Sequence, residues 1–195
     1  MIVTIDGPVA SGKSSVARAL AAHLSIYYLY SGLLYRGIAY LLWQSYGYDS
    51  TLIAHVCERD LRACVDTLSY VFSPSHGALL YAGERNITSE LKLSYIDTLA
   101  SIVSVNAGVR SAVYYLQHAI AGTNDVVVDG RDTGTSVFPE AMHKFYLTAH
   151  DAIRARRWQY DQYKRGNTYT FAESLQKLRN RDQQDMQRTL SPLVK

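Results

Sequence analysis

The sequence predicts an α/β fold with a parallel sheet, and three observations lead to that prediction. Short apolar runs alternate with stretches of helical periodicity along most of the chain. A glycine-rich segment separates the first of these runs from the first helical stretch. Residues 68–87 differ, because short runs broken by turn residues are typical of antiparallel strands. The expected architecture is therefore a parallel sheet between helices with a small antiparallel insert.

The amino terminus carries a phosphate-binding motif in its proper context. Residues 1–6 are an apolar run ending in an acid, which indicates a buried parallel strand. Residues 14–24 have apolar or small side chains at helical spacing. The segment between them fits G-x-x-x-x-G-K-[ST] and comprises Gly7, Pro8, Val9, Ala10, Ser11, Gly12, Lys13, Ser14 and Ser15. A strand before and a helix after identify this segment as a P-loop.

The chemistry of a P-loop predicts a nucleoside triphosphate ligand and a fold of the P-loop NTPase type, with three layers. Gly7 and Gly12 let the backbone close around phosphate oxygens, and the loop N–H groups supply partial positive charge. We expect Lys13 to reach the β- and γ-phosphates and the Ser14 hydroxyl to ligate Mg²⁺. The alternative, a glycine-rich turn that binds nothing, does not explain the flanking strand and helix.

The other expected elements follow from local patterns. Further parallel strands are predicted at residues 27–29, 125–129 and 143–147, and an antiparallel meander at 68–72, 78–81 and 85–87. Helices are predicted at residues 31–45, 52–64, 90–105, 109–121 and 151–164. The sequence Thr170-Phe171-Ala172-Glu173 is a capping box that opens a last helix, which runs toward Gln187.

Length and composition indicate one globular domain over residues 1–195, with the meander as an insert. No apolar run approaches membrane-spanning length, and the amino-terminal strand leaves no room for a signal peptide. We therefore expect a cytoplasmic protein without a membrane partner. Cys57 and Cys64 are too few for a disulfide framework, so we expect them to be reduced packing residues.

The net charge of +3 is too small for a nucleic-acid partner, which requires a broad basic face. Twelve of the twenty Lys and Arg residues nevertheless lie in residues 131–195. Arginine dominates this set, and its planar fork matches phosphate bidentately. We interpret the carboxyl-terminal third as phosphate-binding, with a solvated helix face as the alternative.

Three further segments resemble the motifs of one family. Residues 31–36 resemble S/T-G-x-x-Y-R, and residues 129–139 resemble D-G-R-D-x-G-T-x-V-F-P. Residues 181–193 resemble R-D-x-x-D-x-x-R-x-x-x-P-L. Together with the P-loop and the meander, they make the whole chain similar to the bacterial cytidylate kinases. The resemblance implies Mg²⁺-dependent transfer of a phosphoryl group from ATP to CMP or dCMP. We expect the protein to be a monomer.

The resemblance also implies roles for individual residues. A CMP-binding insert would span residues 65–105, and an Arg-rich helical lid would span 151–166. Catalytic roles fall on Lys13, Arg36, Arg131, Arg154 and Arg157, and the metal ligand would be Ser14. CMP-binding roles fall on Arg36 and Arg131 for the phosphate, on Ser31, Arg110 and Asp132 for cytosine, on Ser101, Arg181 and Asp185 for the ribose, and on Arg188 near the phosphates.

The chain departs from the family pattern at three places. Relatives carry Asp where this chain has Tyr30, which puts the organisation of Mg²⁺ in doubt. They have paired arginines where this chain has Arg157-Trp158. They also continue beyond the Pro-Leu segment with a strand and a helix, whereas this sequence stops at Lys195. A missing strand would uncover a sheet edge, so weaker ATP binding, marginal stability or dimerisation are hypotheses.

Two alternatives to a (d)CMP kinase stay open. One is a kinase for another small acceptor, such as UMP, shikimate or dephospho-coenzyme A. The other is a catalytically impaired homologue that binds nucleotides without transferring phosphate.

Overall fold

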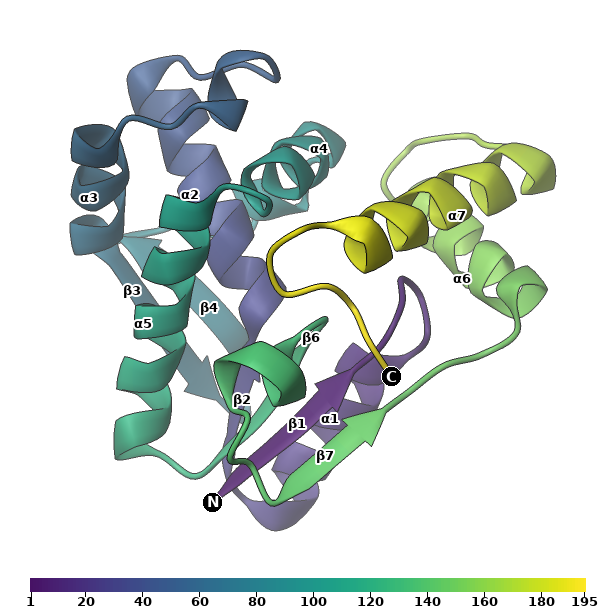
Figure 1. Cartoon of the computed structure of the whole chain (residues 1–195), viewed down its shortest axis with the longest axis horizontal. Helices are drawn as coiled ribbons and strands as arrows, with labels where there is room; N and C mark the ends of the chain where they lie inside the picture. The colour runs from purple at the N-terminus through teal and green to yellow at the C-terminus, as the bar shows by residue number, and fades with distance from the viewer. The chain divides into compact units, whose positions relative to one another are not determined.

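A computed structural model describes all 195 residues, and the chain divides into two compact units. The first unit contains residues 1–20 and 127–195, and the second contains residues 21–126. Figure 1 shows the path of the chain through its helices and strands.

The parallel sheet confirms the predicted α/β class. Its strand order is β2-β6-β1-β7, with bounds Tyr27–Tyr30, Val126–Gly130, Ile2–Asp6 and His143–Tyr146. In the first unit, β1 pairs with β7 in parallel, and Val3 lies opposite His143. Every residue of β6 is buried, as expected of a strand covered on both faces.

The first unit also contains most of α1 (Lys13–Leu24) and all of α6 (Asp151–Lys164) and α7 (Phe171–Gln187). Figure 1 shows α6 and α7 side by side, in light green and yellow. The predicted capping box opens α7, because the Thr170 hydroxyl accepts the N–H of Glu173 and the Glu173 carboxylate accepts the N–H of Thr170. The Arg-rich helix and the last helix are thus confirmed at residues 151–164 and 171–187.

The second unit is built around α2 (Ser31–Tyr46). Leu34, Ile38 and Leu42 recur every four residues along α2 and are fully buried, so this stripe is the centre of the unit's core. Helices α3 (Glu58–Thr67), α4 (Ser94–Val103) and α5 (Ala107–Thr123) all pack against α2. None of the protein's helices is long and apolar enough to cross a membrane.

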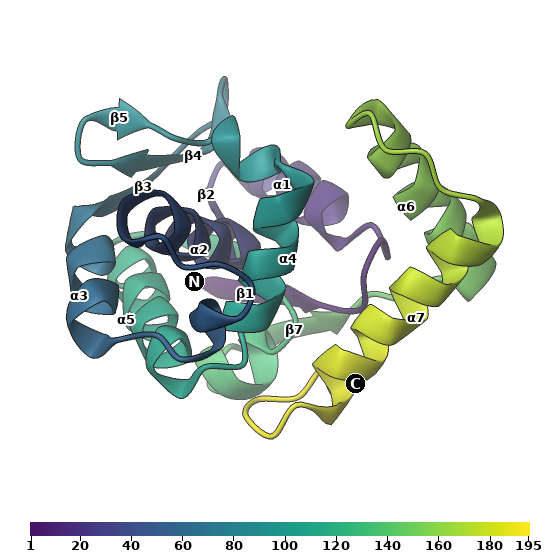
Figure 2. The same ribbon diagram turned by 90° about the horizontal axis from the view of Figure 1, so that it is seen from above.

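The predicted meander is present as a separate antiparallel sheet in the order β3-β4-β5. Its strands are Leu68–Ser73, Gly77–Ala82 and Arg85–Asn86, and Figure 2 shows them at the edge of the second unit. Leu68 pairs with Ala82 and Ser73 with Gly77, so the turn lies where Pro74 and Gly77 predict it.

The prediction of a single helix over residues 52–64 is wrong at the start of that range. A 3₁₀ turn at Leu52–Ala54 precedes α3, which begins only at Glu58. The Asp49 carboxylate accepts the N–H groups of Thr51 and Leu52, and this local turn competes with the helix. The Tyr48 hydroxyl then accepts the N–H of Cys57. The helix predicted from residue 90 likewise begins with a 3₁₀ turn at Glu90–Lys92, and α4 follows from Ser94.

Gly37 lets α2 approach β4 closely, which makes it a test of the core. A Cβ at Gly37 would lie 2.2 Å from Cδ2 of Leu80, a fully buried side chain. We therefore expect Gly37→Ala to lower the free energy of unfolding by about 1–3 kcal/mol. Urea unfolding followed by circular dichroism measures the change.

The matched control for Gly37→Ala is Gly122→Ala in α5, where an added Cβ would meet nothing within 4 Å. Alanine at that helical position should raise the stability by about 0.5–1 kcal/mol. A Gly37→Ala protein as stable as the unmodified one would contradict the packing described here.

Candidate functional site

The P-loop adopts a conformation that its glycines make possible. Gly7 and Gly12 have φ angles of 152° and 102°, and L side chains rarely adopt such values. A Cβ at Gly7 would lie 2.0 Å from the carbonyl oxygen of Leu147, so only glycine fits there. The loop therefore turns directly from β1 into α1, as the motif predicts.

The Lys13 side chain is buried within the P-loop. Its Nζ atom donates to the carbonyl oxygen of Pro8 at 3.1 Å. Burial and the positive charge of Arg131 lower the pKa of Lys13 to about 7, although Asp129 and Asp185 act in the opposite direction. An anion in the loop would favour the charged ammonium form.

Ser14 and Asp129 bring together two oxygen groups suited to Mg²⁺. The Ser14 hydroxyl donates to Oδ2 of Asp129, which lies on the fully buried strand β6. Hydroxyl and carboxylate oxygens are the hard ligands that Mg²⁺ prefers, and the ion usually keeps several waters and phosphate oxygens as well. These residues therefore fit the metal that the motif implies.

Asp6, at the end of β1, anchors the loop that follows β6. Its carboxylate accepts the N–H groups of Thr133 and Gly134 at 2.9 and 2.7 Å, and the Thr133 hydroxyl at 2.8 Å. Burial raises the pKa of Asp6, and the hydrogen bonds from this loop oppose the increase only in part. A π-helical turn at Thr133–Val137 follows. From the sequence alone, Asp6 is only the acid that ends the first strand.

Arg131, Arg181 and Asp185 form one charged cluster in the first unit. Nε of Arg131 donates to Oδ2 of Asp185 at 2.8 Å, and Nε of Arg181 lies 3.5 Å from Oδ1. Burial alone would raise the pKa of Asp185, but the two guanidinium groups outweigh it and lower the pKa. The structure thus brings together three residues that the sequence analysis assigned to substrate binding.

Asp132 and Arg188 form a second pair in the same unit. Nη2 of Arg188 donates to Oδ1 of Asp132 at 2.8 Å, and both side chains are buried. Nε of Arg188 also donates to the carbonyl oxygen of Ser191. The segment after α7 thereby holds Arg188 against the loop that carries Asp132.

Two arginines of α6 contact the P-loop backbone. Nη1 of Arg157 donates to the carbonyl oxygen of Ser11, and Nη1 of Arg154 donates to that of Val9, both at 3.0 Å. Arg154 is buried and forms ion pairs with Asp151 at 2.7 Å and Asp182 at 2.6 Å. The structure places Arg154 and Arg157, which the resemblance assigned to catalysis, beside the P-loop.

Asp182 is a site residue that the sequence analysis missed. Its Oδ1 accepts the N–H of Val9 in the P-loop at 3.1 Å, while Oδ2 pairs with Arg154. The available signal was its place in the carboxyl-terminal motif, where it follows Arg181 directly. A short acidic side chain next to a predicted binding residue is weak evidence by itself, which explains the omission.

Four predicted residues, Ser31, Arg36, Ser101 and Arg110, lie in the second unit. Nε of Arg36 donates to Oδ1 of Asp97 at 2.6 Å, and Nη1 donates to the Tyr30 hydroxyl. Nη1 of Arg110 donates to the carbonyl oxygen of Ser104 at 3.2 Å, one helical turn after Ser101. Ser31 is buried at the start of α2.

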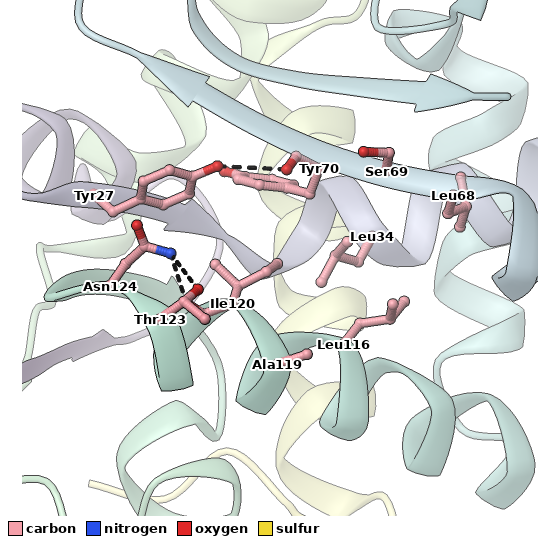
Figure 3. Close-up of a pocket in the computed structure, with 10 residues that line it drawn as sticks. All are labelled: Tyr27, Leu34, Leu68, Ser69, Tyr70, Leu116, Ala119, Ile120, Thr123 and Asn124. Atoms are coloured by element: carbon pink, nitrogen blue, oxygen red, sulfur yellow. Dashed lines mark hydrogen bonds between the residues drawn. The ribbon is translucent and has the colours of Figure 1, made fainter. Parts of the chain in front are cut away.

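The second unit also contains a cavity that is unsuited to phosphate. Its volume is about 290 Å³, and Figure 3 shows it between α5 and β3. No charged side chain lines it; the lining residues are Tyr27, Leu34, Leu68, Ser69, Tyr70, Leu116, Ala119, Ile120, Thr123 and Asn124. Arg36 and Arg110, the two predicted cationic residues of this unit, are therefore not among the residues that line the cavity.

Comparison with known proteins gives the same family along nearly the whole chain. The family model for cytidylate kinase matches residues 3–195. A cytidylate kinase of Burkholderia mallei (strain NCTC 10229) is 36% identical over 194 residues, covering 98% of this chain and 80% of the relative. A cytidylate kinase of Stutzerimonas stutzeri (strain A1501) is 35% identical over 195 residues, covering 98% and 82%. The chain belongs to the cytidylate kinase family.

Proposed function

We propose that this protein transfers a phosphoryl group from ATP to CMP or dCMP, giving ADP and CDP or dCDP. One observation carries the proposal. Asp6 ends β1 immediately before the P-loop, and it also binds the loop after β6 that carries Arg131 and Asp132. Groups suited to a phosphate donor and to an acceptor nucleotide are therefore fixed at adjacent strand ends of one unit.

Positioning and charge neutralisation account for the chemistry. Phosphoryl transfer brings two anions together in line, so the enzyme must surround both with cations and N–H donors. The P-loop N–H groups and Lys13 would hold the donor phosphates, and Arg131 would neutralise the acceptor phosphate. A nucleotide phosphate is already a nucleophilic oxyanion, so the protein needs no general base to activate it.

Mg²⁺ is the expected companion of ATP, and Ser14 and Asp129 are the residues that would hold it or its waters. When bound, the ion supplies positive charge to the phosphate oxygens. We assign Arg154 and Arg157 to the donor side, because both already donate hydrogen bonds to the P-loop. In the second unit, we assign Arg36 to the acceptor phosphate.

Asp132 is the residue that would distinguish cytosine from uracil. Carboxylates accept hydrogen bonds from the exocyclic amine of cytosine, whereas uracil presents a carbonyl oxygen at that position. The pair with Arg188 holds the Asp132 carboxylate in place. We assign the ribose to Ser101, Arg181 and Asp185. We assign the base to Ser31 and Arg110, together with Asp132.

The first test measures ADP release from ATP and Mg²⁺ with CMP, dCMP, UMP, AMP and shikimate as separate acceptors. We expect turnover with CMP and dCMP, and Lys13→Ala should lower that rate at least about 100-fold, because one cation at the transferring phosphate is lost. The surface variant Lys177→Ala should keep the full rate. Binding of CMP without ADP release would identify an impaired homologue, and turnover confined to another acceptor would identify a different kinase.

The lowered pKa of Lys13 predicts that ATP binding takes up a proton. At pH 8 a lysine with a pKa of about 7 is mostly neutral, and the bound phosphates would raise its pKa. Uptake should approach about one proton per site at that pH and fall as the pH drops below 7. Titration calorimetry in two buffers that differ in ionisation enthalpy measures it. Lys13→Arg stays charged and should bind without uptake; buffer-independent heats for the unmodified protein would contradict the prediction.

The role of Asp132 predicts a change in base selectivity. Asn in its place can turn either its oxygen or its NH₂ group toward the base, so Asp132→Asn should lower the CMP-to-UMP ratio of kcat/KM by about 10-fold or more. The ratio is its own control, because the two acceptors share phosphate and ribose. A ratio equal to that of the unmodified protein would remove Asp132 from the base pocket.

A further inference from the structure

Tyr30 makes contacts that the proposed function does not use. It is the last residue of β2, and its hydroxyl accepts a hydrogen bond from Nη1 of Arg36. The guanidinium carbon of Arg36 lies 5.5 Å from the centre of the Tyr30 ring. Arg36 is the residue of this unit assigned above to the acceptor phosphate, so Tyr30 lies beside a proposed phosphate ligand.

The contacts of Arg36 leave one side of its guanidinium group available. Of the five N–H donors, Nε binds Asp97 at 2.6 Å, and Nη1 binds the Tyr30 hydroxyl and, weakly at 3.5 Å, the carbonyl oxygen of Gly32. Both N–H groups of Nη2 remain. The side chain as a whole is 22% exposed, so it is not fully enclosed by the core.

The Tyr30 hydroxyl also has a hydrogen left to donate. A phenol can accept and donate at the same time, and Tyr30 accepts from Arg36. Its free hydrogen and the Nη2 group of Arg36 belong to hydrogen-bonded partners, so the two donors lie close together. A pair of neighbouring donors, one of them cationic, is suited to a phosphate oxygen.

Tyr30 is held in place by three neighbours of its own unit. Its N–H donates to the Tyr70 hydroxyl at 2.9 Å, and its ring stacks on Tyr28 with centroids 6.4 Å apart and planes within 5°. A Cβ at position 32 would lie 2.8 Å from the ring, so Gly32 leaves the space that the ring occupies. The hydroxyl is therefore positioned by the fold and does not depend on Arg36 alone.

We propose that Tyr30 binds the acceptor's phosphate directly, its hydroxyl donating beside Nη2 of Arg36. The inference rests on the proposed function, because the phosphate in question is that of the acceptor nucleotide. A carboxylate at the same position could also hold Arg36, but it would repel the incoming dianion and have no hydrogen to donate. A phenol orients the arginine and adds a donor.

The test compares Tyr30→Phe with the unmodified protein for two ligands, CMP and cytidine, which differ only in the phosphate. Phenylalanine keeps the ring and removes the hydroxyl. We expect the dissociation constant for CMP to rise about 10- to 100-fold, which is the loss of one hydrogen bond to a charged group, and that for cytidine to stay the same. Titration calorimetry measures both.

The control is Tyr115→Phe, which removes a hydroxyl from a tyrosine that is 69% exposed on α5 and should change neither affinity. Equal weakening of CMP and cytidine binding by Tyr30→Phe would show that the hydroxyl only supports the fold, and unchanged CMP binding would show that it does not touch the phosphate. Either result overturns the inference while the kinase assignment stands. If the unmodified protein does not bind CMP, the proposed function fails first and this inference fails with it.

Discussion

The carboxylate of Asp6 is the contact on which the first unit's site depends. The P-loop follows β1, and the loop with Arg131 and Asp132 follows β6. The ends of these two strands must therefore keep a fixed position relative to each other. Asp6 joins them with three hydrogen bonds from Thr133 and Gly134. Gly134 is equally constrained, since a Cβ there would lie 2.5 Å from Oγ1 of Thr4. Burying a carboxylate costs free energy unless hydrogen-bond donors surround it. The Asp6 contact is therefore favourable only while all three of these hydrogen bonds are made.

A second constraint follows from how the arginines are paired. Arg131 contacts Asp185, Arg188 contacts Asp132, and Arg154 contacts Asp182. Buried arginines without partners would be strongly destabilising, whereas paired ones are held in fixed orientations. A phosphate that binds such an arginine therefore shares or displaces a carboxylate and does not meet a bare cation. The net gain is smaller than the Coulomb attraction suggests, but the geometry is established before the substrate arrives.

Much of the fold could be predicted from the sequence, because its signals are local. The capping box at Thr170 and Glu173 fixes the start of α7, and the glycines of the P-loop fix the turn after β1. The break before α3 could not be predicted from periodicity, because it depends on side chains, Asp49 and Tyr48, that bind backbone N–H groups.

The candidate site was predicted less completely, because its contacts join residues that lie far apart along the chain. Motifs identified the residue types, and the structure then brought Arg131 and Asp185 together across 54 positions. Asp182 was missed because its partner Val9 lies 173 residues away, and no local pattern reports such a contact.

Tyr30 illustrates how a departure from an expected motif can be interpreted physically. Compared with the Asp that relatives carry before Ser31-Gly32, the tyrosine puts the organisation of Mg²⁺ in doubt. The structure shows the hydroxyl against Arg36, whose guanidinium group also pairs with Asp97. Burial alone would lower the pKa of Arg36, but these two partners more than offset it and raise the pKa. The arginine therefore stays charged with a single carboxylate partner, and a neutral neighbour leaves more of its positive charge for an anionic ligand than a second carboxylate would.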